Sequence, residues 1–251
     1  MIFVRSLVAL LVLVFVAENA KGDDFPSSIE RCKFEDNECL KKSWNKYIKL
    51  SGNPNGLPEL KVPDTHNYKI PMVTITPGEG PLDVKLIMRD IDLTGFDHAV
   101  VDRIDEFPKD PKQMSQFTIS IHISYIRIEG MYNVTGKVLL LPVTGADEGE
   151  VKFDNVRLNV TAYTSTKMVD GKEYLKIRRV SCSYDTDRIH YRFENILNNK
   201  EISDSINRML NENQDLINNE VKPSVIRILS GIFKRVLVDS FTKYPYSSYF
   251  L

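Results

Sequence analysis

The spacing of apolar residues changes twice along the chain, and each change predicts a different kind of structure. Near the start, Leu40, Trp44 and Ile48 recur at intervals of four, which places them on one face of a helix. Asn37 can cap the first turn of this helix, and Gly52 with the Asn-Pro pair after it can end the helix. We therefore expect a short amphipathic helix, followed by a loop rich in proline.

From residue 70 to about 195, apolar and polar residues alternate with a period of two, which is typical of β-strands. The alternating runs cover residues 72–76, 84–93, 117–128, 131–141, 151–166, 173–184 and 188–193. Asp170-Gly171, between two such runs, predicts a tight hairpin. Gly130 and residues 143–146 carry turn signals and are interpreted as further connections.

One of these runs changes face partway along its length. Phe117, Ile119 and Ile123 share one parity, whereas Ile126 and Ile128 take the other. An extra residue in one strand turns the side chains of the following residues to the opposite face of the sheet and increases the local twist. We therefore expect a β-bulge in a strongly curved sheet.

The last part of the chain follows a helical period. From Ile202 to Leu237 apolar residues recur every three or four positions, which predicts one continuous helix about 54 Å long, kinked at Pro223. Ile206 lies on the apolar stripe, so its replacement by Ala should cost about 2–5 kcal/mol. Asn207 falls off the stripe, and its replacement should cost under about 0.5 kcal/mol.

These elements together predict an α+β fold. A helix of that length cannot bury its stripe against itself, so the economical arrangement wraps a long, strongly curved antiparallel sheet around it as a half-barrel. We expect residues 23–251 to form this single domain.

The first residues predict a secretory leader. Arg5 precedes an apolar run at 7–16, and Ala20 and Gly22 supply the small residues of a cleavage site before Asp23. The apolar run is too short to cross a membrane, which needs about 20 residues. We expect residues 1–22 to be removed and the mature protein to be extracellular, with an uncleaved N-terminal anchor as the alternative.

Secretion gives meaning to the cysteines and to two glycosylation sequons. Cys32 and Cys39 are close enough in sequence to form a disulfide, whereas Cys182 has no evident partner and is expected to be a buried, unreactive thiol. Asn133 and Asn159 each begin an Asn-x-Thr sequon and lie opposite the apolar parity of their strands. We expect both asparagines to face solvent and to carry glycans.

Composition and chemistry narrow the function. The chain has 33 Lys+Arg against 34 Asp+Glu and no basic block, which argues against nucleic-acid binding. Its four histidines are scattered, and neither a Gly-x-Ser-x-Gly elbow nor a metal-binding helix motif occurs. We expect no catalytic residues, no metal, no cofactor and no integral membrane segment.

The order of several motifs resembles that of the insect takeout and juvenile hormone-binding protein family. These motifs are the N-terminal Cys pair, Gly56-Leu57-Pro58, the segment 132–142, the segment 210–213, Lys222-Pro223 and Tyr244-Pro245-Tyr246. The resemblance covers nearly the whole mature chain. It implies a TULIP-like half-barrel with an internal hydrophobic tunnel for a lipophilic ligand. The classical carriers have a second disulfide that this chain lacks, so the resemblance favours the takeout branch, which is linked to circadian, feeding and behavioural output.

Inward-facing positions are the candidate ligand-lining residues, although each could equally be ordinary core. They are Tyr132, Val134, Leu140, Ala162, Phe193, Ile228, Ile232 and Phe233. We expect Ala162→Trp to block a tunnel with little change in stability, but to destabilise a filled core. The function expected from the sequence is a monomeric carrier of a juvenile hormone-like terpenoid or fatty acid. The alternative is a secreted signalling protein that acts at a receptor or membrane surface and holds a merely structural lipid.

Overall fold

The computed structural model describes residues 25–76, 82–107, 115–138 and 141–251. The expected leader and Leu140 lie outside these residues. The elements in chain order are α2 (Asn37–Ser51), η1 (Pro58–Leu60), β1 (Asn67–Ile75), β2 (Leu82–Thr94), η2 (Phe96–His98), β3 (Val100–Asp105), β4 (Ser115–Val138), β5 (Leu141–Val169), β6 (Lys172–Asp185), β7 (Arg188–Phe193), α3 (Lys200–Glu212), α4 (Gln214–Thr242) and η3 (Tyr246–Tyr249).

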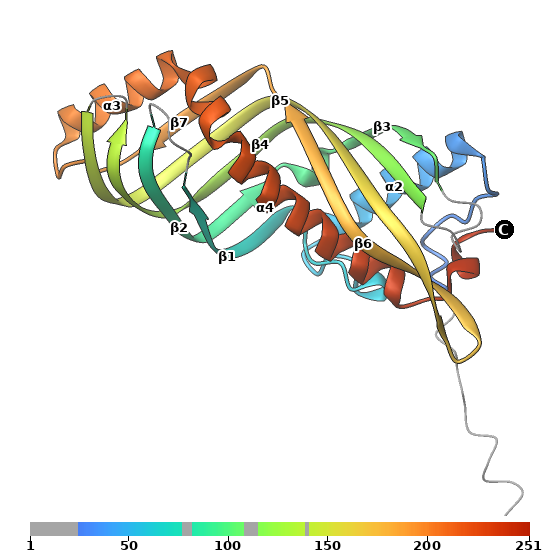
Figure 1. The fold of residues 1–251 in the computed structure, drawn as a ribbon. Helices are drawn as coiled ribbons and strands as arrows, with labels where there is room; N and C mark the ends of the chain where they lie inside the picture. Colours follow the sequence, from blue (N-terminus) through green and yellow to red (C-terminus); the bar gives the residue numbers. More distant parts are fainter. Residues whose placement is uncertain (1–24, 77–81, 108–114, 139–140) are drawn as a thin grey trace, which may run out of the picture.

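One antiparallel sheet curls around a long helix, which confirms the predicted α+β half-barrel. The strand order is β1-β2-β4-β5-β6, with β3 paired to β4 and β7 paired to β5. Helix α4 runs along the concave side of the sheet, and α3 lies at one end beside β7 (Figure 1). The core therefore forms between the concave face of the sheet and the apolar side of α4.

Two of the predicted turns are wrong, because the strands run straight through them. Gly130 lies inside β4, and residues 143–146 lie inside β5, so both strands are longer than the alternation indicated. A Cβ at Gly130 would come within 2.7 Å of the carbonyl oxygen of Arg89, so this glycine permits close strand approach rather than a turn. The hairpin at Asp170-Gly171 is confirmed, with φ of 50° and 75° at its two residues.

The predicted change of face is present, although its cause differs from a simple bulge. On β4, Ile123 and Ile126 are both buried although they are three residues apart. On β5 the same holds for Phe153 and Val156, so the buried face switches from odd to even positions at the same place in both strands. Their pairing register does not change across this point, and Asn155 takes a positive φ of 51°. The two strands therefore change face together. A register shift occurs instead between β2 and β4.

The prediction of one continuous C-terminal helix is also wrong, because the structure has two helices there. Asn213 has φ −112° and ψ 26°, outside helical values, and separates α3 from α4. Its backbone N–H donates to the carbonyl of Met209, and its own carbonyl accepts from the N–H of Ile217, so it ends one helix and begins the next. The break precedes Pro223, which lies within α4. The N-terminal helix is confirmed, with Asp36 rather than Asn37 as its cap.

Side-chain amides of helix α3 form hydrogen bonds with the backbone groups on the outer edge of β7. Asn207 accepts from the N–H of Phe193 and donates to its carbonyl, both at 2.9 Å. Asn211 makes the same two bonds to Tyr191, at 2.8 and 2.9 Å, and Gln214, the first residue of α4, accepts from the N–H of Ile189. These residues replace a neighbouring strand, because they pair the backbone groups that an edge strand leaves open. The expectation that Asn207 is dispensable is therefore wrong.

We predict that Asn207→Ala lowers the free energy of unfolding by about 2 kcal/mol, because it leaves two backbone groups of β7 without partners. Arg208→Ala, at the exposed next position of the helix, should change it by under about 0.5 kcal/mol. Ile206 is 4% exposed, and its replacement by Ala remains expected to cost about 2–5 kcal/mol. Urea melts of the three variants measure these differences, and equal values for Asn207→Ala and Arg208→Ala would refute the role of the amides.

Candidate functional site

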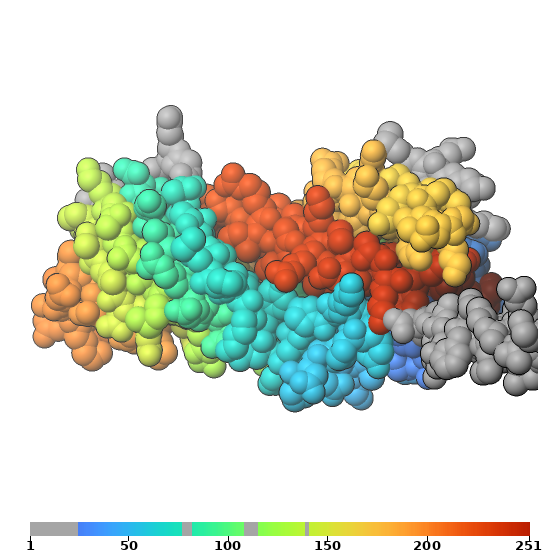
Figure 2. Space-filling view, turned by 90° about the horizontal axis from the view of Figure 1, so that it is seen from below, coloured from blue at the N-terminus to red at the C-terminus, as the bar shows by residue number. Residues whose placement is uncertain are grey.

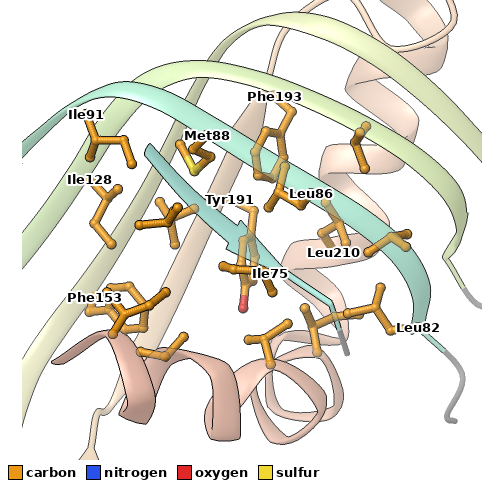
Figure 3. A pocket seen from close by; sticks show the side chains of 18 of the residues that line it. Ile75, Leu82, Leu86, Met88, Ile91, Ile128, Phe153, Tyr191, Phe193 and Leu210 are labelled. Atoms are coloured by element: carbon orange, nitrogen blue, oxygen red, sulfur yellow. The ribbon is translucent and has the colours of Figure 1, made fainter. Parts of the chain in front are cut away.

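Three cavities lie along α4 in the described part of the chain, and the largest of these three, between the concave face of the sheet and α4, is apolar. Its free volume is about 170 Å³ (Figure 3). Strands β1, β2, β4, β5 and β7 and helices α3 and α4 all contribute wall residues. An apolar cavity of about 150 Å³ is enough to stay dry and bind a small hydrocarbon. This space therefore suits an apolar ligand.

The wall follows from the alternation of the strands. Leu82, Val84, Leu86 and Met88 occupy every second position of β2 and all line the cavity. Residues at i and i+2 point to the same side of a sheet, so one strand supplies a row of apolar side chains. On α4 the facing positions include Val225.

Two smaller cavities continue along α4. The second, of about 80 Å³, shares Leu93 and Ile232 with the first, so these two side chains separate the two spaces. The third, of about 70 Å³, shares Trp44 and Tyr47 with the second. The interior thus contains a row of mostly apolar spaces, and two side chains separate each space from the next.

The third cavity is bounded by both ends of the described chain. Cys32 and Cys39 form a disulfide next to α2, and the backbone N–H of Leu251 donates to the carbonyl of Cys32 at 3.0 Å. Phe34 and Phe250 stack there with their ring centroids 3.9 Å apart. The C-terminal residues therefore close this end of the row.

The structure separates the residues proposed from sequence into three groups. Four line the largest cavity, namely Val134, Phe193, Ile228 and Ile232. Phe233 lines the second cavity. Tyr132 and Ala162 are buried but line none of the three cavities. Leu140 lies outside the described residues.

Tyr132 and Ala162, which line none of the three cavities, pack against neighbouring side chains instead. The hydroxyl of Tyr132 donates to the carbonyl of Glu194 at 2.5 Å, and its ring meets Phe193 edge-on at 5.0 Å. Ala162 is fully buried between Phe117 and Val180 on the neighbouring strands. Ala162→Trp is therefore not expected to block a tunnel, because Ala162 lies in filled core and not on a cavity wall.

Sequence reasoning missed most of the wall, because it concentrated on β4, β5, β7 and the second half of α4. The missed residues include the inward row of β2 and, on the helices, Leu210, Ile217, Val221 and Val225. The signal was available in β2, where Leu82, Val84, Leu86 and Met88 keep a period of two, although Ile87 interrupts the alternation.

Two tyrosine hydroxyls approach the largest cavity. Burial raises the pKa of Tyr184 and of Tyr191 well above the ordinary value, so both remain protonated donors at neutral pH. Tyr184 donates to Oδ1 of Asn218 at 2.6 Å. The hydroxyl of Tyr191 points into the cavity (Figure 3) and forms no hydrogen bond with another described residue. Tyr191 therefore offers a free donor to whatever occupies the space.

The other reactive side chains are dispersed. Burial raises the pKa of the Cys182 thiol, and its backbone N–H donates to Ser230. His66 pairs with Asp97 at 2.8 Å on the surface, and this hydrogen bond raises the pKa of the imidazole. Across the described ranges, no three His, Cys, Asp or Glu residues are grouped so that they could hold a metal ion. No helix in those ranges is long and apolar enough to cross a membrane.

Comparison with known proteins identifies the family. The family model described as haemolymph juvenile hormone binding protein (JHBP) matches residues 9–251. The chain belongs to the JHBP family. The Takeout 1 crystal structure from Epiphyas postvittana matches with a TM-score of 0.70 and 19% identity, over 86% of this chain and 97% of that chain, which shows a common fold.

Two relatives of this JHBP-family chain are described as circadian clock-controlled protein daywake. The Drosophila melanogaster protein is 24% identical over 234 residues, which cover 91% of this chain and 89% of the relative. The Drosophila yakuba protein is 25% identical over 232 residues, which cover 90% and 88%. The alignments span nearly the whole JHBP domain.

We predict effects of different size for two enlarged side chains in this JHBP domain. Ala162→Trp should lower the free energy of unfolding by about 1–3 kcal/mol, because that position has no free space. Val225→Trp should change it by less than about 1 kcal/mol, because the indole can extend into the cavity. Denaturant melts compare the two variants, and an equal loss at Val225 would mean that the cavity is filled or collapses in solution.

Proposed function

We propose that this JHBP-family chain is a carrier that reversibly binds an elongated lipophilic molecule, such as a juvenile hormone-like terpenoid or a fatty acid. The observation that carries the proposal is the row of apolar cavities between α4 and the sheet. Burying about 15 carbons at roughly 0.8 kcal/mol each offers about 12 kcal/mol before ordering costs, which leaves submicromolar affinity. Rotation of the dividing side chains Leu93 and Ile232 would join neighbouring spaces for a longer chain.

The proposal is one of binding without chemistry. The wall of the largest of the three cavities consists of aliphatic and aromatic side chains with two tyrosine hydroxyls, which can orient a ligand but supply no paired acid and base. We further propose that the carrier works as a monomer and without a cofactor.

We propose that the protein is secreted and that residues 1–22 are its leader. The family description refers to haemolymph, and the disulfide between Cys32 and Cys39 suits an oxidising compartment. Asn133 and Asn159 are exposed, so glycans would meet no steric barrier. The names of the daywake relatives support a link to circadian or behavioural output.

Peptide mapping of protein secreted from insect cells tests this covalent state. We expect a mature N-terminus at Asp23, a Cys32–Cys39 bridge, an unmodified Cys182 and glycans on both asparagines. Cys182 is 5% exposed, so it should resist alkylation until the protein unfolds. Unmodified asparagines would contradict the glycosylation, and a retained leader would favour the anchor alternative.

The Tyr191 hydroxyl is proposed to orient the polar group of the ligand. Tyr191→Phe should weaken binding of a ligand that carries an ester or carboxyl oxygen by about 3- to 10-fold, the worth of one hydrogen bond. Binding of a hydrocarbon of equal length should not change. Titration calorimetry with both ligands measures the difference, and equal losses for the two would indicate a packing effect alone.

Ligand uptake tests the carrier function directly. Protein delipidated under native conditions should bind a fluorescent fatty acid or labelled juvenile hormone at micromolar concentration, and organic extraction of the native protein should release a lipid. Val225→Trp should abolish uptake. Arg227→Trp, at an exposed position of α4 that lines a surface depression and not the row of cavities, should bind as the parent does. If neither probe binds and no lipid is released, the signalling alternative replaces the carrier.

A further inference from the structure

The tip of the β5–β6 hairpin carries exposed apolar side chains beside lysines. Met168 is 65% exposed and Val169 is 40% exposed, although both belong to a well-paired hairpin. A Cβ built on Gly171 at the turn would meet no atom within 4 Å, so the tip is not covered by other described residues. The hairpin extends past the end of α4 in Figure 1 and stands out from the surface in Figure 2.

The strand register assigns these side chains to two faces of the hairpin. Val169 lies opposite Lys172, Lys167 opposite Tyr174, and Ser165 opposite Lys176, and residues opposite each other share a face. We call the residues of this face, together with Met168, which points from the tip toward the opposite face, the hairpin surface; its members are Lys167, Met168, Val169, Lys172, Tyr174 and Lys176.

The charge on the hairpin surface is of one sign. Its three lysines are exposed, and none pairs with a carboxylate among the described residues. The nearby acids are Glu173, which shares the opposite face with Met168, and Asp170 at the turn, so the face that carries the three lysines holds no carboxylate. Lysines that surround an aliphatic side chain and a tyrosine match the chemistry of an anionic lipid surface, because tyrosine and snorkelling lysine both favour the interface.

We propose that the hairpin surface docks this protein on bilayers that contain anionic phospholipid. Met168 and Val169 enter the headgroup boundary, and the three lysines contact the lipid phosphates. Binding is peripheral, because two apolar side chains bury too little area for irreversible insertion.

The hairpin lies near one end of the row of cavities, which relates docking to ligand exchange. Strand β6 packs against η3, and Tyr249 of η3 lines the third cavity. A docked molecule therefore holds this end of its row of cavities near the bilayer, and a lipophilic ligand would pass between the two when the C-terminal residues that close this end move aside. This role in ligand exchange rests on the proposed carrier function, whereas docking on the bilayer does not.

Co-sedimentation with phosphatidylcholine vesicles, with and without phosphatidylserine, tests the proposal on the full mature protein. The parent should bind only the vesicles with phosphatidylserine, and added salt should weaken binding because it screens the lysines. Lys167→Gln/Lys172→Gln should weaken binding by about tenfold or more. Met168→Ser/Val169→Ser should also weaken it strongly, whereas Met72→Ser, at a 56% exposed methionine on β1, should have no effect. Unchanged melting temperatures show that each variant is folded.

Three results would overturn the proposal. The first is no binding of the parent to vesicles with phosphatidylserine. The second is an equal loss in the Met72→Ser control. The third is binding that depends on the lysines but not on Met168 and Val169 and that heparin abolishes, which would indicate a soluble polyanion instead. Ligand uptake measured without vesicles reports separately on the carrier function, so either conclusion can fail alone.

Discussion

The structure depends on a mismatch between a wide curved sheet and the single helix that covers it. Every strand supplies apolar side chains to the concave face, and that area must be buried to stabilise the fold. Helix α4 runs along the concave side of the sheet (Figure 1) but does not fill the space there. The sides of the groove therefore stay apart around the helix, and the remaining apolar space becomes the row of cavities. The binding space is thus a consequence of how the core is built.

The same sheet must be closed at its edges. At β7 the closure comes from a helix, because the amides of Asn207 and Asn211 pair with alternate residues of the strand. This requirement explains the break at Asn213. Helix α3 must lie beside β7 to present its amides, whereas α4 must cross the concave face, and one straight helix cannot do both. The C-terminal part of the chain therefore divides at a residue that can end one helix and start the next.

The sequence predicts the fold class, most strands and both helical regions, because hydrophobic periodicity reports directly on which face is buried. It misplaces boundaries where local signals and tertiary contacts disagree. Gly130 is a turn signal by composition, yet it serves close strand packing. Asn207 is polar and lies off the apolar stripe, yet its partner is a backbone edge that no periodicity reveals. Ala162 shows a further limit, since alternation identifies inward positions but cannot distinguish a cavity wall from filled core.

Pairs of side chains divide the interior into compartments, and for the proposed carrier this division has a consequence for ligand selectivity. Affinity for a homologous series of ligands need not grow evenly with each added methylene. A chain that fits within one compartment gains by filling it, whereas a slightly longer chain must first rotate Leu93 or Ile232 out of its way. Chain length would then be discriminated in steps whose positions are set by the spacing of the partitions along α4. A change of one partition residue would shift a step and leave the remaining compartments as they were.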